Sequence, residues 1–205
     1  MRIRVPESFC VHRLTPAVVK FHNRMPNVKL RFITCAQEGL KRDLRKGVTD
    51  LAFLLTDSIQ SKDLAVENLG TEHLVFVAAP NHPLSKIDKF EIDMSTDHTL
   101  LLSRVDCSYR RILEQILQES RCEPKIVLEF NSVAAIIECV AVGLGVTLIP
   151  EIAVSRKLEL KHLATLPWSE NRIEVAQLMI WHQDKWLSPI LKGFMDTARE
   201  VLKNS

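Results

Sequence analysis

Short hydroxyl and amide side chains follow several predicted strands of this 205-residue chain, close to the start of a predicted helix. The free N–H groups of a helix N-terminus and a nearby hydroxyl can together bind an anionic group. Each serine in such a place could instead serve only as a helix cap, and a cap serine can also donate to a ligand. The segments with this pattern are Pro6-Glu7-Ser8-Phe9, Ser103 with Cys107-Ser108, and Asn131-Ser132.

Catalytic motifs give a weaker explanation of the chain. Cys10 and His12 could form a nucleophile and base, but they stand two residues apart and nothing marks a third group to orient them. The sequence has no Gly-x-Ser-x-Gly elbow, phosphate-binding P-loop or His-Glu-x-x-His motif. Gly143-Leu144-Gly145 ends a predicted helix before a strand, the reverse of a dinucleotide fingerprint. We therefore expect no enzyme activity.

The cysteines and histidines are scattered along the chain. No CxxC pair and no histidine cluster at metal-ligand spacing occurs among the five cysteines and seven histidines. We therefore expect no metal and no cofactor, with reduced thiols in a cytoplasm.

The charge balance is close to neutral. Lys and Arg total 27 against 25 Asp and Glu, a net charge of +2, which is too little for a chain that mainly grips phosphates. The short basic clusters Lys41-Arg42 and Arg110-Arg111 are expected on solvated helix faces. No apolar stretch is long enough to cross a membrane, and no signal segment is visible. These features predict a soluble protein inside the cell.

The elements that must position these residues alternate between strands and helices. The first 55 residues predict strand, helix, strand, helix, strand, which is typical of a parallel α/β layer. Residues 64–80, with two apolar strands around Gly70, are expected to cross between two lobes, and residues 175–181 to return. One large sheet could use the same elements. Besides the crossing segments, the predicted strands are residues 3–6, 28–34 and 50–55 within the first 55 residues, 74–79 at the end of the outward crossing, and 99–102, 126–130 and 146–149.

The predicted helices show apolar residues at spacings of three and four. The first carries Val11, Leu14 and Phe21 on one face and could restart at Thr15-Pro16, read as a cap followed by proline. The last begins at a Ser188-Pro189 cap. The others lie around residues 40–44, 112–117 and 136–140.

Five segments resemble, in order, the effector domain of LysR-type transcription regulators, and together they cover essentially the whole chain. The most specific is VAAPNHPL, residues 77–84; the others are IRVPESF, FHNRMPNVKLRF, GVTDLAFL and VAVGLGVTLIP. The resemblance implies an α/β fold of two Rossmann-like lobes of the type 2 periplasmic-binding-protein kind, joined by two crossing strands. Lobe I would be residues 1–70 plus 177–205, and lobe II residues 71–176.

The same resemblance implies a function. A small effector, expected to be an anionic metabolite, would bind between the lobes and change the geometry of a homodimer or tetramer, and so promoter binding and transcription. DNA would be bound only through an N-terminal winged helix-turn-helix that this chain does not contain. Dimer contacts are expected on the helix with residues 11–21 and on helix 110–119. The alternatives are a stand-alone solute-binding protein or an enzyme on the same fold.

The resemblance also adds Thr34, Cys35 and Thr56 as ligand-binding candidates, since these loop tips of lobe I face the cleft in this family. Arg104 could pair with a carboxylate ligand or face solvent, and Glu7 could select an amine or hydroxyl. Phe9 and Ile149 could supply apolar walls. The full candidate set is Pro6, Glu7, Ser8, Phe9, Thr34, Cys35, Thr56, Ser103, Arg104, Cys107, Ser108, Asn131, Ser132 and Ile149.

Overall fold

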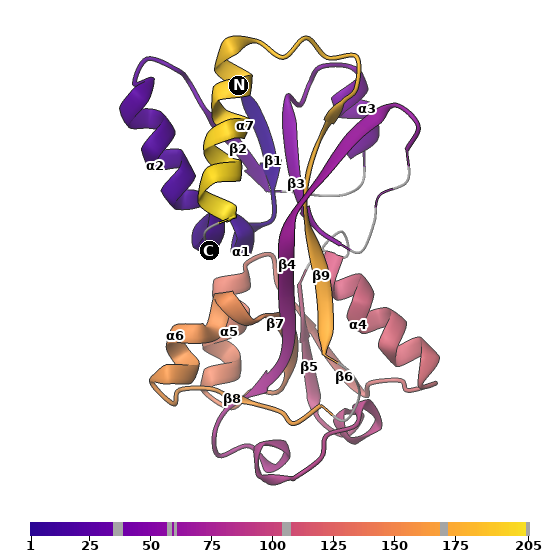
Figure 1. Ribbon diagram of the computed structural model, residues 1–205. Helices are drawn as coiled ribbons and strands as arrows, with labels where there is room; N and C mark the ends of the chain where they lie inside the picture. Colours follow the sequence, from indigo (N-terminus) through magenta and orange to yellow (C-terminus); the bar gives the residue numbers. More distant parts are fainter. Residues whose placement is uncertain (35–38, 57–58, 60, 104–107, 169–171, 204–205) are drawn as a thin grey trace. The chain divides into compact units, whose positions relative to one another are not determined.

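The chain forms two compact units, shown in Figure 1. Unit 1 consists of Met1–Thr71 and Val175–Ser205, and unit 2 of Glu72–Glu174. The computed structural model describes residues 1–34, 39–56, 59, 61–103, 108–168 and 172–203. Within each unit, strands alternate with helices along the chain.

The sheet of unit 1 has the order β2–β1–β3–β9. The first three strands are parallel, as the strand–helix alternation predicts, and β9 runs antiparallel to β3. The strands β4 and β9 continue into unit 2. The elements are β1 (Arg2–Val5), α1 (Glu7–Phe9), η1 (Cys10–Leu14), α2 (Thr15–Arg24), β2 (Arg31–Thr34), α3 (Leu40–Arg45), β3 (Leu51–Leu55), β4 (Leu64–Ala78), β9 (Ile173–His182) and α7 (Pro189–Leu202).

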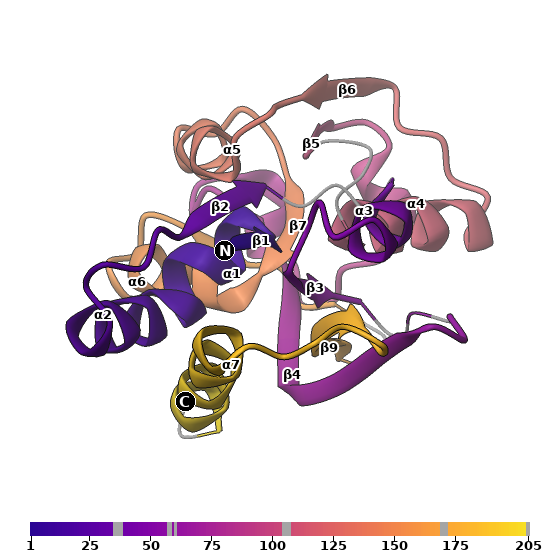
Figure 2. The same cartoon turned by 90° about the horizontal axis from the view of Figure 1, so that it is seen from above.

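The strand β3 is buried on both faces, as its continuous apolar run predicts. Side chains alternate across it: Phe53 stacks on Phe9 at a ring distance of 5.5 Å, while Leu54 belongs to the cluster that includes Leu40 and Leu44 of α3. The helices α2 and α7 meet through Phe21 and Phe194, whose ring centroids are 5.2 Å apart. In Figure 2, α7 and α2 lie together, away from α3.

The first helix differs from the predicted one. It begins at Glu7, directly after β1, and η1 is a π-helical turn between α1 and α2. The hydroxyl of Thr15 donates to the carbonyls of Cys10 and Val11, at 2.9 and 3.0 Å, and so does not cap a helix N-terminus. Val11, in this π turn, is 56% exposed, whereas Leu14 at its end is fully buried. Val11 is therefore not a core residue, and the dimer contacts expected on residues 11–21 stay a prediction.

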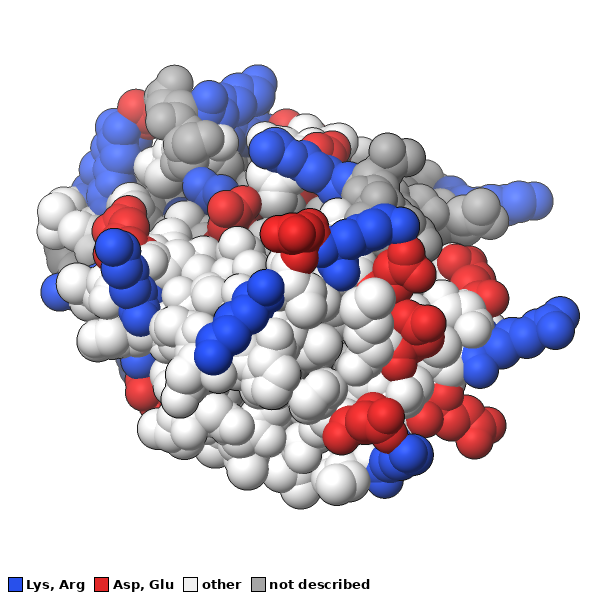
Figure 3. All heavy atoms as spheres, turned by 90° about the horizontal axis from the view of Figure 1, so that it is seen from below, with Lys and Arg blue, Asp and Glu red and all other residues white. Residues whose placement is uncertain are grey.

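Unit 2 contains two groups of paired strands. The strand β4 pairs with β7 and β8, both antiparallel, while β5 and β6 are parallel, and a parallel bridge joins Leu100 of β5 to Val146 beside β7. The face drawn in Figure 3 has a broad area with few charged side chains, and Asp and Glu gather on its right-hand side. The elements are η2 (Pro83–Lys86), η3 (Ile92–Ser95), β5 (Thr99–Leu102), α4 (Ser108–Glu119), β6 (Ile126–Glu129), α5 (Val133–Ala141), β7 (Thr147–Pro150), α6 (Glu151–Glu159) and β8 (Ala164–Thr165).

The segment predicted to cross between lobes is one strand, not two. The strand β4 runs unbroken for 15 residues, and Gly70 lies within it at a φ of +156°. The side chain of Asn68 accepts a hydrogen bond from the Gly70 N–H at 3.0 Å. The glycine therefore does not end the strand. No helix in the described part of the chain is long and apolar enough to cross a membrane.

Candidate functional site

Three predicted site segments of unit 1 lie at one edge of its sheet. The parallel strands β1, β2 and β3 all end there, with Val5 opposite Thr34 in the register. Pro6 and Ser8 follow β1, and Thr56 follows β3. Thr34 is exposed, whereas Thr56 is half-buried and its N–H donates to the Ala176 carbonyl at 3.1 Å. This edge is where ligands bind open α/β sheets.

Ser8 is the most informative residue at this edge. It is 2% exposed, and its hydroxyl has no hydrogen-bond partner among the described residues. It does not cap the helix, since Pro6 occupies the cap position. A buried hydroxyl without a partner costs about 1–3 kcal/mol. A ligand that accepts from the Ser8 hydroxyl would offset that cost.

The two residues expected to form apolar walls lie in the cores. Phe9 is 1% exposed and stacked on Phe53. Ile149 is also 1% exposed and lies opposite Val75 in the β4–β7 ladder. Neither side chain offers appreciable surface, so both act by supporting the elements that carry the polar groups.

Unit 2 has a comparable edge. Leu102 of β5 lies opposite Glu129 of β6, so Ser103 and the Asn131-Ser132 pair follow strands that end side by side. Asn131 is exposed. Ser132 caps α5, its hydroxyl oxygen accepting from the Ala135 N–H at 3.4 Å, which is one of the two compatible roles that the sequence left open for it. The N-terminus of α5 therefore opens at this edge, where its dipole favours negative charge.

Ser103 parallels Ser8. It is 7% exposed, and its hydroxyl also has no hydrogen-bond partner among the described residues. The neighbouring hydroxyl of Thr147 is satisfied, because it donates to the Leu101 carbonyl at 2.7 Å. Within the described parts of the chain, each unit thus has a buried hydroxyl without a partner where parallel strands end.

Arg110 is buried, contrary to the prediction from the sequence. The expectation that it lies on a solvated helix face is wrong: it is 8% exposed. Its guanidinium donates to the Ser103 carbonyl at 2.8 Å, to Glu129 at 2.7 Å and to Glu114 at 2.8 Å. Burial alone would lower the pKa of Arg110, but its bonds to Glu129 and Glu114 raise it. The Arg110–Glu114 spacing of four residues was the available sequence signal.

The charge of Arg110 is therefore already balanced within unit 2. Its hydrogen bond and charge lower the pKa of Glu129, which stays ionised. Two carboxylates face one guanidinium, so this cluster does not attract an anion. Arg110 instead fixes the Ser103 main chain, and with it the position of the unsatisfied hydroxyl.

Four of the predicted site residues have no described side chain. Cys35, Arg104 and Cys107 lie outside the described residues, and Ser108 is described only as the first residue of α4. Among the described residues, no three His, Cys, Asp or Glu side chains are grouped so that they could hold a metal ion. A cavity of about 540 Å³ in unit 1 contains none of the predicted residues; it is lined by Met1, Lys29, Asp50, Trp186 and Ile190 among others.

Known proteins similar to the chain are transcriptional regulators, not enzymes. The uncharacterized HTH-type transcriptional regulator YwqM of Bacillus subtilis is 35% identical over 204 residues, which are 99% of this chain and 69% of YwqM. The HTH-type transcriptional regulator GltR of the same organism is 29% identical over 201 residues, 98% of this chain and 66% of GltR. The chain thus spans about two thirds of the length of these relatives.

Solved structures show the same fold. The regulatory domain of CcmR from Synechocystis PCC6803, in complex with 2-PG, has a TM-score of 0.86 at 19% identity, covering all of this chain and 97% of that one. The effector binding domain of QuiR, in complex with shikimate, has a TM-score of 0.77 at 21% identity, with the same coverage. The predicted two-lobe α/β fold is confirmed. The family model of the LysR substrate binding domain matches residues 1–203, and the chain belongs to that family.

Proposed function

We propose that this chain is the effector-sensing domain of a LysR-type transcription regulator and that its ligand is a small anionic metabolite. The observation that carries the proposal is the pair of buried hydroxyls, Ser8 and Ser103, at the strand ends of the two units, for which the described residues supply no hydrogen-bond partner. Two structural neighbours are complexes with small molecules, 2-PG in CcmR and shikimate in QuiR.

The remaining candidates fall into groups with different roles. Ser132 and the N-terminus of α5 would receive the negative group of the ligand, because helix N–H groups and the dipole favour it. Pro6, Thr34 and Thr56 would contribute the unit 1 edge. We include Glu7, Asn131 and, from outside the described residues, Cys35, Arg104 and Cys107, together with Ser108, as sequence-based proposals.

A thermal-shift screen against carboxylates, amino acids and other small metabolites, shikimate and benzoate among them, tests the proposal. A ligand that binds the native state raises the melting temperature saturably and is recovered unchanged. Chemical conversion of a hit would favour the enzyme alternative. No saturable hit from a screen that includes anionic metabolites would contradict the proposal.

Serine variants test the site itself. Ser8→Ala and Ser103→Ala each remove a buried hydroxyl that lacks a partner, so the ligand-free protein should keep its stability or gain slightly. Each should weaken ligand binding by about tenfold or more, the value of a hydrogen bond to a charged group. Ser155→Ala is the matched control, because that hydroxyl already donates to the Ile152 carbonyl on α6. Unchanged affinity in both test variants would refute the site assignment.

We further propose that the whole protein acts in the cytoplasm as a homodimer or tetramer and reaches DNA through a separate domain. The ligand must bind one arrangement better than another, with a coupling on the order of 1–3 kcal/mol. The division into lobe I and lobe II at residues 70–71 and 176–177 is part of this proposal.

The charge distribution supports pairing of two copies. Unit 1 carries 16 Lys and Arg against 10 Asp and Glu, and unit 2 carries 11 against 15, so their net charges are +6 and −4. Two copies that pair unit 1 with unit 2 would bring opposite charges together. Each unit also has an edge strand with exposed aliphatic residues, Ile33 in β2 and Ile126, Val127 and Leu128 in β6.

A further inference from the structure

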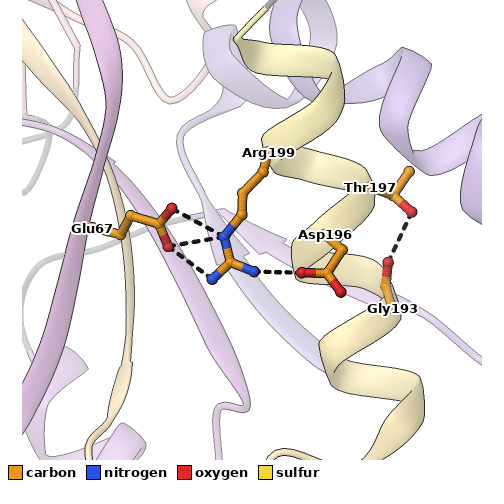
Figure 4. Close-up of polar contacts among 5 residues, drawn as sticks. All are labelled: Glu67, Gly193, Asp196, Thr197 and Arg199. Carbon is orange, nitrogen blue, oxygen red and sulfur yellow. Dashed lines mark hydrogen bonds and ion pairs between the residues drawn. The ribbon is translucent and has the colours of Figure 1, made fainter.

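Within unit 1, the crossing strand β4 is attached to α7 by a two-pronged ion pair. The Arg199 Nε donates to both carboxylate oxygens of Glu67, at 3.0 and 3.0 Å, and Nη2 donates to Oε2 at 2.8 Å, as Figure 4 shows. Both side chains are 28% exposed. A planar guanidinium paired in this way fixes orientation as well as distance. The pair therefore holds β4 against one side of α7.

A second carboxylate orients the arginine from within the helix. Asp196 accepts from the Arg199 Nη1 at 2.6 Å, and Figure 4 shows it on α7 beside Arg199. The hydroxyl of Thr197 donates to the Gly193 carbonyl at 2.8 Å and stays within α7. Of the polar residues drawn in Figure 4, Glu67 is therefore the one that connects α7 to a different element, β4.

The strand is also fixed at its last residue in unit 1. The Gln177 side chain, 4% exposed, donates from Nε2 to the Thr71 carbonyl at 3.1 Å. Gly70 lies between the Gln177 contact and the Glu67 contact, with its positive φ. Bending of the strand would concentrate at Gly70, because that residue has the widest range of allowed backbone angles.

The helix α7 passes the attachment on to α2. Glu200, the residue after Arg199, forms an ion pair with Lys20 of α2. Adjacent residues of a helix point about 100° apart, so α7 binds β4 and α2 with different faces. The Phe21–Phe194 contact adds an apolar connection between the same two helices.

We propose that Glu67 and Arg199 form a mechanical link through which a change in the course of β4 reaches α7 and, through Glu200 and Lys20, α2. The strand continues past Thr71 into unit 2 as far as Ala78, so the link begins on an element that both units share. The use of this link in regulation rests on the proposed function, whereas the link itself does not.

Hydrogen exchange measured by mass spectrometry on the full chain, without any ligand, tests the link. Glu67→Gln removes the charge that joins β4 to α7, and exchange in residues 64–71, α7 and α2 should accelerate by about tenfold. Asp196→Asn is the matched control: it removes the other carboxylate on Arg199, and it should leave β4 and α2 within about twofold of wild type. The helix α3 is the internal reference for general destabilisation.

Two outcomes would overturn the proposal. One is faster exchange in β4 with no change in α2. The other is equal acceleration of α3, which would show a general loss of stability. The reversed pair Glu67→Arg with Arg199→Glu should restore wild-type exchange in α2. Because no ligand is present, a negative result here is distinct from a failed ligand screen.

A double-variant cycle provides an independent check. Lys20→Met breaks the α2 end of the link, so its effect on α2 exchange should not add to that of Glu67→Gln. Independent, additive effects of the two variants would refute a shared path.

Discussion

We predict that Gly145→Ala destabilises the fold, and the contacts around Gly145 give the size of the loss in unfolding free energy. A Cβ at this position would lie 2.1 Å from the Thr99 carbonyl oxygen and 2.9 Å from the Leu101 Cδ1. To reach an allowed contact, the backbone of β5 must move on the order of 1 Å. That movement breaks two hydrogen bonds of 2.9 Å, from the Val146 N–H to Thr99 and from the Leu101 N–H to Val146.

The expected cost of Gly145→Ala follows from these contacts. Two buried backbone hydrogen bonds are worth about 1 kcal/mol each, and overpacking adds about 1–3 kcal/mol. We therefore expect a loss of about 3–5 kcal/mol in unfolding free energy. For a chain of this length, that is a fall in melting temperature of about 6–20 °C.

The assay is urea unfolding followed by tryptophan fluorescence and circular dichroism, with calorimetry as a second measure. Gly193→Ala is the control with the opposite sign: its Cβ would meet Phe21 and Met25 at 3.8 Å, an ordinary contact, and alanine in a helix interior is favoured by about 0.5–1 kcal/mol. An unfolding free energy for Gly145→Ala within about 0.5 kcal/mol of wild type would refute the reasoning from close approach.

Two further predictions concern pH and association. The His82 ring accepts the Leu84 N–H through Nδ1, and burial, then His98, lowers the pKa of His82 below its usual 6.5. Its stabilising contribution is therefore complete above pH 6.5 and is lost as the pH falls toward the folded-state pKa. His82→Asn keeps an acceptor but cannot titrate, so it should lose less stability than wild type between pH 7 and pH 5 in urea titrations; equal losses would contradict this. In the homodimer that we propose, Val127→Asp should shift the sedimentation of the chain toward monomer, while Val142→Asp, at a position 84% exposed, should not; a dimer unchanged by Val127→Asp would exclude β6 from the interface.

The elements that could be predicted are those whose signal is local. The strand β3 is a continuous apolar run, and Ser188 caps α7 by accepting the Leu191 N–H at 3.2 Å. In both cases a few adjacent residues determine the structure. The π turn at Cys10–Leu14 has no such local signal, since its widening depends on how the helix packs.

The polar contacts that the sequence did not reveal join distant residues. Arg199 and Glu67 are 132 positions apart, and Arg110 and Glu129 are 19 apart. Nothing in the spacing of charged residues selects such partners among the 27 basic and 25 acidic side chains. Arg110–Glu114 and Asp196–Arg199, four and three residues apart on one helix each, were within reach of a periodicity argument.

The hydroxyls of Ser8 and Ser103 do not contribute to the stability of the fold, but they are expected to bind a ligand. Alanine would fit the space of either serine without leaving a hydroxyl unsatisfied, so the ligand-free fold gains nothing from either hydroxyl. By contrast, the hydroxyls of Thr147 and Ser132 have partners that stabilise β7 and α5. A buried hydroxyl without a partner among the described residues, at the strand ends where α/β sheets bind ligands, supports the proposal that a ligand accepts its hydrogen bond. For this reason we propose Ser8 and Ser103 as ligand contacts, whereas Ser132 also serves as a cap.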